Sequence, residues 1–377
     1  MDFLLTLWNY VLPFLVVLTI LVFVHELGHY WVARRCGVRV DVFSIGFGPE
    51  LFGWNDRSGT RWRISAIPLG GYVKMAGDTN AASMPGETAP ELTPEERAVA
   101  FQHKSLAQRA AIVVAGPAAN FLFALIVYAI LFATVGQPFT PPEVGAVVPA
   151  SAAEAAGLRV GDRVLKLDGQ NVRRFEDIQR IVQVQPGVPL DMLVQREGQE
   201  LRLKATPASI ELKDRLGNVQ VIGQLGISRT GIEVIQHDPL TAVWRAGEHT
   251  FDMSGMILKV VGQMIAGTRP ANEIGGILRI GYVSGEATQA GLVSIVNFLA
   301  LLSINLGLIN LFPVPMLDGG HLVFYAIEAL RGRPLGARAQ EYGLRVGFAL
   351  VITLMLFATW NDLVHFRVVE FVRQIVG

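Results

Sequence analysis

Two histidines and a glutamate near the N-terminus have the spacing of a zinc site. The sequence HELGH occupies residues 25–29. Residues four positions apart lie on one face of an α-helix, so His25 and His29 can direct both imidazoles at one ion. Glu26 is then placed to take a proton from a water activated by zinc. The alternative is that this segment is only the polar end of an apolar helix, with its histidines bonded to backbone carbonyls.

A third protein ligand must come from elsewhere, because catalytic zinc keeps three protein ligands and a water. The single cysteine, Cys36, is not a plausible ligand. Asp318 stands out among the acids near apolar stretches, in the sequence NLFPVPMLDGG at residues 310–320. Two prolines there interrupt a helix, and broken backbone at membrane depth is tolerated only where it lines a cavity or is buried in protein. Asp318 can equally be the N-cap of a following helix, and spacing alone does not decide between the two.

A further histidine follows three residues after Asp318. His321 can act as a fourth ligand or stabilise an oxyanion, but such a histidine more often supports its neighbours or caps a helix. We therefore do not include it among the predicted site residues.

The segments that carry these residues are strongly apolar. Of 377 residues, 51% are hydrophobic and 17% charged, whereas a typical soluble domain has about 25% charged residues. A membrane-spanning helix needs about 20 residues, and four stretches are long enough: residues 3–31, 106–135, 292–312 and 344–360. Lys+Arg and Asp+Glu both total 32, so there is no chain-wide basic field and no nucleic-acid partner is expected.

Basic residues predict the orientation of these spans. They flank three span ends: Arg34, Arg35, Arg39, Lys104, Arg109, Arg331, Arg333, Arg338 and Arg345. By the positive-inside rule these ends are cytoplasmic. Both termini, and the long region between the second and third spans, then lie on the opposite side. Arg367 and Arg373 oppose this orientation, but the three agreeing flanks outweigh them.

Two further segments have a recognisable pattern. Residues 40–75 are predicted to form short strands with glycine turns, and residues 78–96, rich in Ala, Pro, Thr and Glu, to be mobile. Apolar residues at helical spacing over residues 240–265 predict an amphipathic helix. Two placements of that helix stay open: on the membrane surface, or packed on the soluble module described next.

The region between the second and third spans reads as a soluble module. Strands are predicted at residues 144–148, 163–167, 190–195 and 200–205, around one helix at residues 175–184. The run at residues 151–169 resembles the PDZ signature, in the permuted arrangement of bacterial proteases. That resemblance implies a groove in which an extended peptide, here a peptide C-terminus, adds as a strand.

The motifs together resemble the site-2 protease family of intramembrane zinc metalloproteases, in its bacterial regulator-of-sigma-E protease branch. The resemblance covers nearly the whole chain. It rests on HELGH, on residues 310–319, on the PDZ-like module between them, and on the shorter motifs GPAANF at 116–121, GGYVKM at 70–75 and Asn361-Asp362 after the fourth span. One departure is that we find a single PDZ module, where the best-known member of this branch has two.

The resemblance implies a role for each matching residue. His25, His29 and Asp318 would be the ligands of one Zn²⁺ per chain, with Glu26 as general base. Asn310 and Pro313 match positions that hold the substrate helix. A membrane-associated β-loop that engages an unwound substrate strand corresponds to Gly70, Gly71, Tyr72, Val73, Lys74 and Met75.

The expected fold class is a polytopic α-helical membrane protein of about four transmembrane helices, with an inserted extracytoplasmic PDZ-like α+β domain and a small cytoplasmic membrane-associated β-loop region. We divide the chain into seven parts. The first four are a first span with the zinc motif (residues 1–33), a cytoplasmic loop region (34–104), a second span (105–137) and the periplasmic PDZ domain (138–232). The last three are a connector with the amphipathic helix (233–290), a third span with the aspartate motif (291–330), and a cytoplasmic loop with the fourth span (331–377).

The expected function is hydrolysis of a peptide bond inside a transmembrane segment of a single-span protein, first cut by another protease. An anti-sigma factor or a remnant signal peptide would be such a substrate. The expected location is the bacterial inner membrane, with the lipid bilayer as partner, the termini and PDZ domain in the periplasm, and the active site near the cytoplasmic side. Two alternatives are a membrane-anchored PDZ scaffold without catalysis, and a transporter, which predicts inverted repeats that the four spans do not show.

Overall fold

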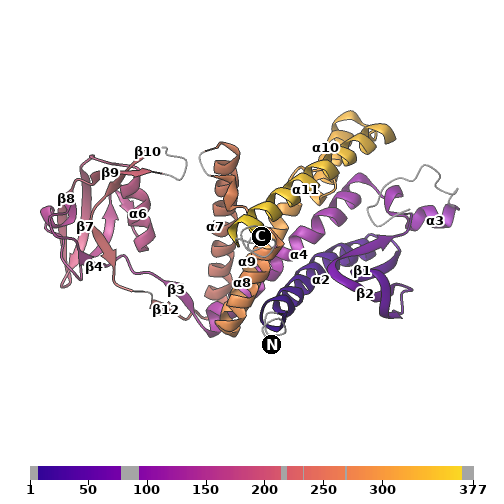
Figure 1. Ribbon diagram of the computed structural model, residues 1–377, viewed down its shortest axis with the longest axis horizontal. Helices are drawn as coiled ribbons and strands as arrows, with labels where there is room; N and C mark the ends of the chain where they lie inside the picture. The colour runs from indigo at the N-terminus through magenta and orange to yellow at the C-terminus, as the bar shows by residue number, and fades with distance from the viewer. Residues whose placement is uncertain (1–6, 78–92, 214–218, 232, 268–269, 367–377) are drawn as a thin grey trace, which may run out of the picture. The chain divides into compact units, whose positions relative to one another are not determined.

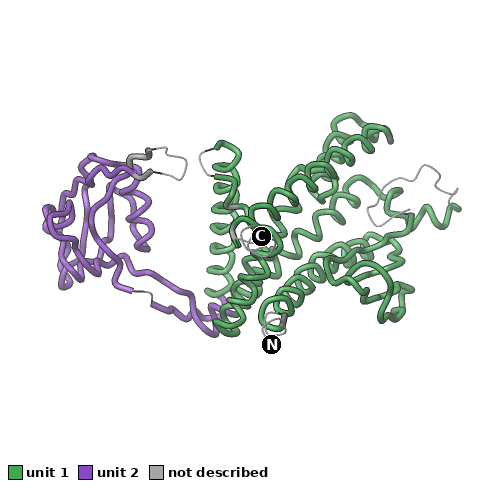
Figure 2. The backbone as a smooth tube through the Cα atoms, viewed as in Figure 1, with its two compact units in different colours: residues 1–130, 241–377 green, residues 131–240 purple. Residues whose placement is uncertain are grey.

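The computed structural model describes residues 7–77, 93–213, 219–231, 233–267 and 270–366. The chain divides into two compact units (Figure 2). Unit 1 combines residues 1–130 with residues 241–377, and unit 2 is residues 131–240.

Four helices of the described chain are long and apolar enough to cross a membrane (Figure 1). Their lengths of 24, 29, 19 and 29 residues compare with the roughly 20 that a span needs. They correspond to the four predicted spans: α2 (Leu12–Arg35), α4 (Leu106–Thr134), α9 (Leu292–Asn310) and α11 (Ala337–His365). A π-helical turn, η1 (Leu7–Val11), precedes the first. The helix around the fourth predicted stretch is longer than predicted, because a helix can continue beyond its apolar window.

The segment after α2 forms a folded β-ribbon against that helix (Figure 1). Instead of several short strands joined by glycine turns, it has two long ones, β1 (Val40–Asn55) and β2 (Arg61–Met75). Register shifts divide them, so that residues 42–45 pair both with residues 71–74 and with residues 61–64. Glycines sit inside the strands: Gly70 has φ +120°, and a Cβ there would lie 2.6 Å from the Phe47 ring.

Short helices connect the ribbon to α4. Most of the stretch predicted to be mobile, residues 78–92, lies outside the described residues. The remainder belongs to α3 (Pro94–Val99), which begins with a capping box between Thr93 and Glu96, and η2 (Phe101–His103) follows. A shared core joins this region to α2 and α4 through Phe43, Val73, Phe101 and Ile112 among others.

The third predicted span ends earlier than expected, in a sharp break. Helix α9 stops at Asn310, residues 311–317 are irregular, and a separate helix, α10 (Asp318–Arg331), begins. A Cβ at Gly319 would lie 2.3 Å from the Leu311 carbonyl oxygen. Only glycine therefore lets α10 start so close to the broken segment.

The region before α9 contains the predicted helix and one that was not predicted. The first is α7 (Pro239–Ile265), in which the small residues Ala242, Ala246 and Thr250 are buried and Trp244 and Phe251 are exposed. Its packing on unit 2 stays an open prediction. After η3 (Ala271–Glu273) comes the unpredicted helix, α8 (Ile277–Gln289).

Asn361 and Asp362 lie inside α11, not after the fourth span as we expected. The Asp362 carboxylate accepts hydrogen bonds from the Gly276 and Arg279 amides at 2.9 and 3.2 Å, at the start of α8. Asn361 donates to the carbonyl oxygen of Ile274. The pair therefore ties α8 to α11.

Unit 2 has the predicted strands and helix, with ends that differ by a residue or so. An antiparallel sheet in the order β6-β5-β7-β8 packs on helix α6 around one apolar core. Its members are β5 (Arg163–Leu167), β6 (Gln170–Asn171), β7 (Leu190–Arg196), β8 (Gln199–Ala205) and α6 (Phe175–Gln183). Three further pairs are β4 (Val144–Val147) with β11 (Ile227–Arg229), β9 (Ala208–Lys213) with β10 (Val219–Gln224), and β3 (Gln137–Phe139) with β12 (Glu233–Ile235), and a short helix, α5 (Ala152–Ala155), follows β4.

Candidate metal centre and active site

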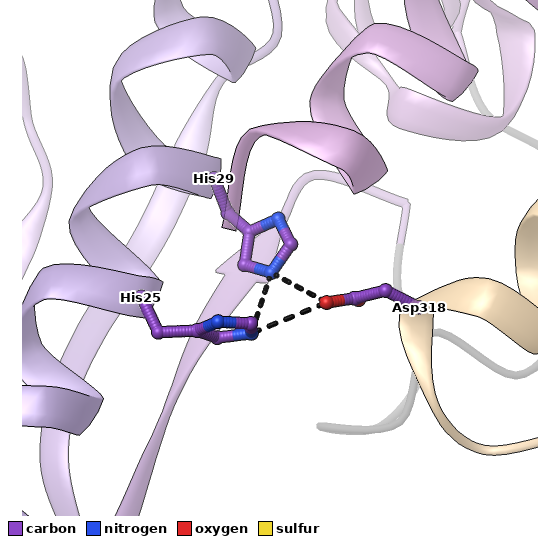
Figure 3. A group of neighbouring side chains, drawn as sticks. All are labelled: His25, His29 and Asp318. Carbon is purple, nitrogen blue, oxygen red and sulfur yellow. Dashed lines mark hydrogen bonds and ion pairs between the residues drawn. The ribbon is translucent and has the colours of Figure 1, made fainter. Parts of the chain in front are cut away.

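Three side chains from two helices converge on one point in unit 1. His25 and His29 lie one turn apart on α2, and Asp318 faces them from the first turn of α10 (Figure 3). The two Nε2 atoms are 3.2 Å apart. Oδ2 of Asp318 lies 3.2 Å from His25 Nε2 and 3.5 Å from His29 Nε2. The tertiary fold thus brings together residues almost 300 positions apart in sequence.

These donor atoms fit a zinc ion. Atoms held at zinc–ligand distances of about 2.0–2.2 Å and tetrahedral angles lie about 3.3–3.6 Å from one another, close to the three separations observed. Oδ2 of Asp318 is buried and makes no hydrogen bond in the described part of the chain. Two imidazole nitrogens and one carboxylate oxygen are also the donor set that zinc accepts in catalytic sites.

The outer face of each imidazole is held by α4. His29 Nδ1 lies 2.8 Å from the Ile112 carbonyl oxygen, and His25 Nδ1 lies 3.1 Å from the Asn120 amide. One histidine thus does bond a backbone carbonyl, as the alternative supposed. It does so through Nδ1, which leaves Nε2 directed at the metal position.

Asp318 is not the N-cap of α10. The N-cap is Leu317, and no side chain caps the helix. Asp318 is the first helical residue, and its carboxylate points at the histidine pair instead of at the amides of its own helix (Figure 3). The geometry therefore favours the ligand interpretation over the capping one.

Glu26 lies beside the histidines and faces a cavity of about 240 Å³. Its carboxyl group lies against the backbone of Val73 in β2. A Cβ at Gly71 would lie 2.8 Å from Val22 Cγ1 and 3.5 Å from Glu26 Cγ. The glycine therefore permits the close approach of β2 to α2 beside the glutamate.

The same cavity contains some of the residues predicted to bind substrate. It is lined by Gly71, Tyr72, Val73, Met75 and Asn310, together with His25, Glu26, His29 and Asp318. Three predicted residues are not in its lining. Gly70 and Lys74 lie on the same strand but outside the cavity, and Pro313 is exposed in the broken segment after α9.

Comparison with known proteins supplies the family. The profile of Peptidase family M50 matches residues 13–354.

This chain belongs to peptidase family M50.

Relatives agree over almost the full length. A relative from Rhizobium meliloti, named as a zinc metalloprotease, is 46% identical over 96% of this chain and 99% of its own. Metalloprotease MmpA of Caulobacter vibrioides is 41% identical over 95% of this chain and 96% of its own. The M50 protein described here is a membrane-embedded, zinc-dependent metalloendopeptidase of the site-2 protease type.

The similarity of this chain to solved structures is weak. The PDZ domain of an SdrC-like protein from Listeria innocua aligns with 24% of this M50 chain and 94% of its own, at 16% identity and a TM-score of 0.20. That score is too low to establish a fold, so the PDZ assignment of unit 2 remains a prediction.

The structure also places residues in the M50 site that sequence reasoning missed. Gly116 is the most constrained, since a Cβ there would lie 2.3 Å from His29 Nε2 and 2.8 Å from His25 Cε1. Met316, with φ +85°, lines the cavity just before Asp318. The motif GPAAN marked Gly116 and Asn120 as unusual in an apolar helix, but its residue types do not by themselves suggest metal chemistry.

His321 lines the cavity without joining the three converging donors. Its ring meets that of Phe324 edge to face, with centroids 6.4 Å apart. A neighbouring cavity of about 230 Å³ shares His321 and Tyr325 with the first, and an ion pair between Arg109 and Glu328 lies in its lining. His321 is therefore one of four residues that line both cavities, with Phe101, Tyr325 and Leu344.

Proposed function

We propose that this M50 peptidase hydrolyses a peptide bond within the membrane-spanning segment of single-span proteins, by the site formed by His25, Glu26, His29 and Asp318. One observation carries the proposal. The two histidines and the glutamate lie inside α2, a helix long and apolar enough to cross a bilayer. Ionisable residues at such positions are costly unless they serve function or are paired in protein.

The roles follow from the positions of the side chains. His25, His29 and Asp318 would hold the zinc ion, which would supply a Lewis acid to activate a water and polarise the scissile carbonyl. Glu26, on the cavity wall beside the histidines, accepts the proton of that water and passes it to the leaving amine. Asn310, on the same wall, can donate its amide N–H groups to the substrate backbone.

A helical substrate must be unwound before its carbonyls are accessible, since each is bonded to an amide four residues on. Residues 71–74 of β2 pair with residues 42–45 on one side, and Gly71, Tyr72 and Val73 line the cavity together with Glu26. We propose that the substrate is held extended along this strand by strand addition. Gly71, Tyr72, Val73 and Met75 would make this contact, whereas Gly70 and Lys74 would support the ribbon.

Unit 2 has a cavity of its own that suits a peptide. A hollow of about 160 Å³ lies between α6 and residues 222–227, and its walls include Phe175, Ile178 and Ile227. We propose that it takes the apolar side chain of an extended peptide or newly formed C-terminus. Titration of purified protein with labelled peptides ending in an apolar or a charged residue would test this, since the apolar end should bind more tightly.

Glu26→Gln tests the catalytic proposal. The variant should still bind one zinc per chain, because the three donors are unchanged, but cleave a membrane substrate at least about 100-fold more slowly, the usual loss for a missing general base. Comparative membrane proteomics of cells with wild-type or variant protein would identify the substrates by their accumulation. Glu95→Gln, at an exposed position in α3, is the matched control.

Two outcomes would count against the proposal. Wild-type cleavage by Glu26→Gln would remove Glu26 from the mechanism. Wild-type protein without stoichiometric zinc would instead favour the membrane-anchored scaffold.

A further inference from the structure

Asn120 is a fully buried polar residue of α4 whose hydrogen bonding is incomplete. It is fully buried, and its amide lies 3.1 Å from Nδ1 of His25. Its Oδ1 has no hydrogen-bond partner among the described residues. Its backbone carbonyl is held separately, by a hydrogen bond of 2.9 Å from the Ser303 hydroxyl of α9. The backbone position is thus fixed while one end of the amide is unsatisfied.

The two histidines need the same tautomer to bind one ion. A neutral imidazole has a proton on one nitrogen and a lone pair on the other. At His29 the neighbour of Nδ1 is the carbonyl oxygen of Ile112, which can only accept. The proton is therefore on Nδ1, and Nε2 has its lone pair toward the metal position.

At His25 the tautomer depends on which end of the Asn120 amide faces Nδ1. If Nδ2 faces it, Nδ1 accepts and the proton sits on Nε2, where it blocks coordination. If Oδ1 faces it, Nδ1 donates and Nε2 is free to bind. A half-turn of the amide exchanges the two ends, which are nearly equal in size. Because Oδ1 has no partner in the described structure, the turn replaces one hydrogen bond and gives up no other.

We propose that Asn120 is a positioning residue of the metal centre: its amide oxygen accepts a hydrogen bond from Nδ1–H of His25 and so holds this histidine in the metal-binding tautomer. Metal-binding histidines generally need such a partner for the nitrogen that does not bind. The inference rests on the ligand set proposed above.

The spacing of α4 supports this role. Ile112, Gly116 and Asn120 are four residues apart and therefore lie along one stripe of the helix. The first supplies the carbonyl for His29, and the second leaves room for both rings because it has no Cβ. Asn120 completes the stripe on the side of His25. One face of α4 thus orients both imidazoles.

Two substitutions of similar size separate the acceptor role from simple filling of space. Asn120→Leu has no acceptor, and its zinc affinity should fall about 10- to 100-fold, the usual cost of losing such a partner. Asn120→Asp keeps an acceptor and loses the donor, so its affinity should stay within a few-fold of wild type. Affinity is measured by competition with a chromophoric chelator on the purified full chain in detergent. Ser303→Ala, which removes only the bond to the Asn120 backbone, should bind zinc as wild type.

A spectroscopic measurement on the wild-type protein makes the test independent of folding of the variants. In ¹⁵N-histidine NMR spectra of the zinc-loaded chain, His25 should be protonated on Nδ1. The proposal is overturned if that nitrogen lacks a proton, if Asn120→Leu binds zinc as wild type, or if Asn120→Asp loses as much affinity as Asn120→Leu. Failure of the ligand set itself is distinguishable, because the wild-type chain would then bind no stoichiometric zinc.

Discussion

The proposed metal centre depends as much on small residues as on the proposed ligands. Gly116 faces the histidine pair, and Gly71 lets β2 approach Glu26. Both positions require a residue without a side chain, since a Cβ at either position would overlap neighbouring atoms. A single methyl group at position 116 therefore competes with the metal for the same space.

Substitution Gly116→Ala should abolish stoichiometric zinc binding. Within a helix, Gly→Ala ordinarily stabilises by about 0.5–1 kcal/mol, but here the new Cβ would lie 2.3 Å from His29 Nε2. Zinc content by atomic absorption is the measurement. As a control, Gly247→Ala in α7, where a Cβ meets no atom within 4 Å, should bind zinc normally. Full zinc content in Gly116→Ala would contradict the close approach of Gly116 to the histidine pair.

At the scale of elements, interruptions of regular structure position the side chains of the site. The end of α9 at Asn310 and the new start at Asp318 turn a side chain toward α2 that a continuous helix would direct elsewhere. Asp362 of α11 similarly fixes the start of α8, because its carboxylate accepts hydrogen bonds from the Gly276 and Arg279 amides there. A carboxylate at this end of a helix stabilises it through both hydrogen bonds and the helix dipole.

Replacement of Asp362 by alanine should loosen α8 without removing zinc. Loss of an N-terminal capping carboxylate costs about 0.5–2 kcal/mol, and Asp362 is buried. Amide hydrogen exchange should therefore become roughly 3- to 30-fold faster in the first turns of α8, while zinc content is unchanged. Asp252→Ala, at an exposed site in α7, is the control. Unchanged exchange in α8 would contradict the capping role.

An ion pair makes unit 2 sensitive to acid. Burial alone would raise the pKa of Asp162, but hydrogen bonds from the Arg196 guanidinium, at 2.7 Å, and the Arg159 amide hold that pKa below its usual value. Its stabilisation is therefore complete above the unfolded-state pKa of about 3.9 and is lost as pH falls through the lower folded-state pKa.

The variant Asp162→Asn should make the stability of unit 2 depend less on pH. Amide exchange within residues 131–240 of the full chain, compared between pH 3 and pH 6, should show acid destabilisation in wild type and less in the variant. At pH 6 the variant should be less stable by about 2 kcal/mol, the scale of a hydrogen bond to a charged group. An identical pH response in both proteins would exclude Asp162 as the acid-sensitive group.

At the scale of the whole molecule, the proposed orientation follows from charge. Arg34 and Arg35 end α2, and the positive-inside rule predicts that this end is cytoplasmic. His29, the proposed ligand nearer to this end, lies five residues before Arg34, between one and two helical turns away. We propose that this chain resides in the bacterial inner membrane, with its active site near the cytoplasmic face and with unit 2 and the termini in the periplasm.

Cysteine labelling tests this orientation, because Cys36 is the only cysteine. In a Cys36→Ser background, Gln199→Cys in unit 2 should react with a membrane-impermeant maleimide in intact spheroplasts. Arg333→Cys, between α10 and α11, should react only after lysis. Both positions are exposed, so accessibility within the fold is matched. The opposite labelling pattern would reverse the topology.

The sequence alone was sufficient where the signal is local. Helical spacing paired His25 with His29, apolar length marked the four spans, and alternation found the strands of unit 2, because each pattern depends on residues within a turn or a strand of one another. Spacing alone left the role of Asp318 open between ligand and cap, and the ligand role was implied only by the family resemblance. It did not predict α8, whose first turn is capped from α11, and it treated the β-ribbon as separate short strands.

The tertiary structure decided what depends on residues far apart in the chain. Asp318 faces the histidines only because α10 begins at a sharp break beside α2. Gly116 and Asn120 lie beside the proposed ligands only because α4 lies against the outer side of both imidazoles. A glycine or an amide has no chemistry that its own sequence neighbourhood reveals. Its role depends on the atoms that packing places beside it.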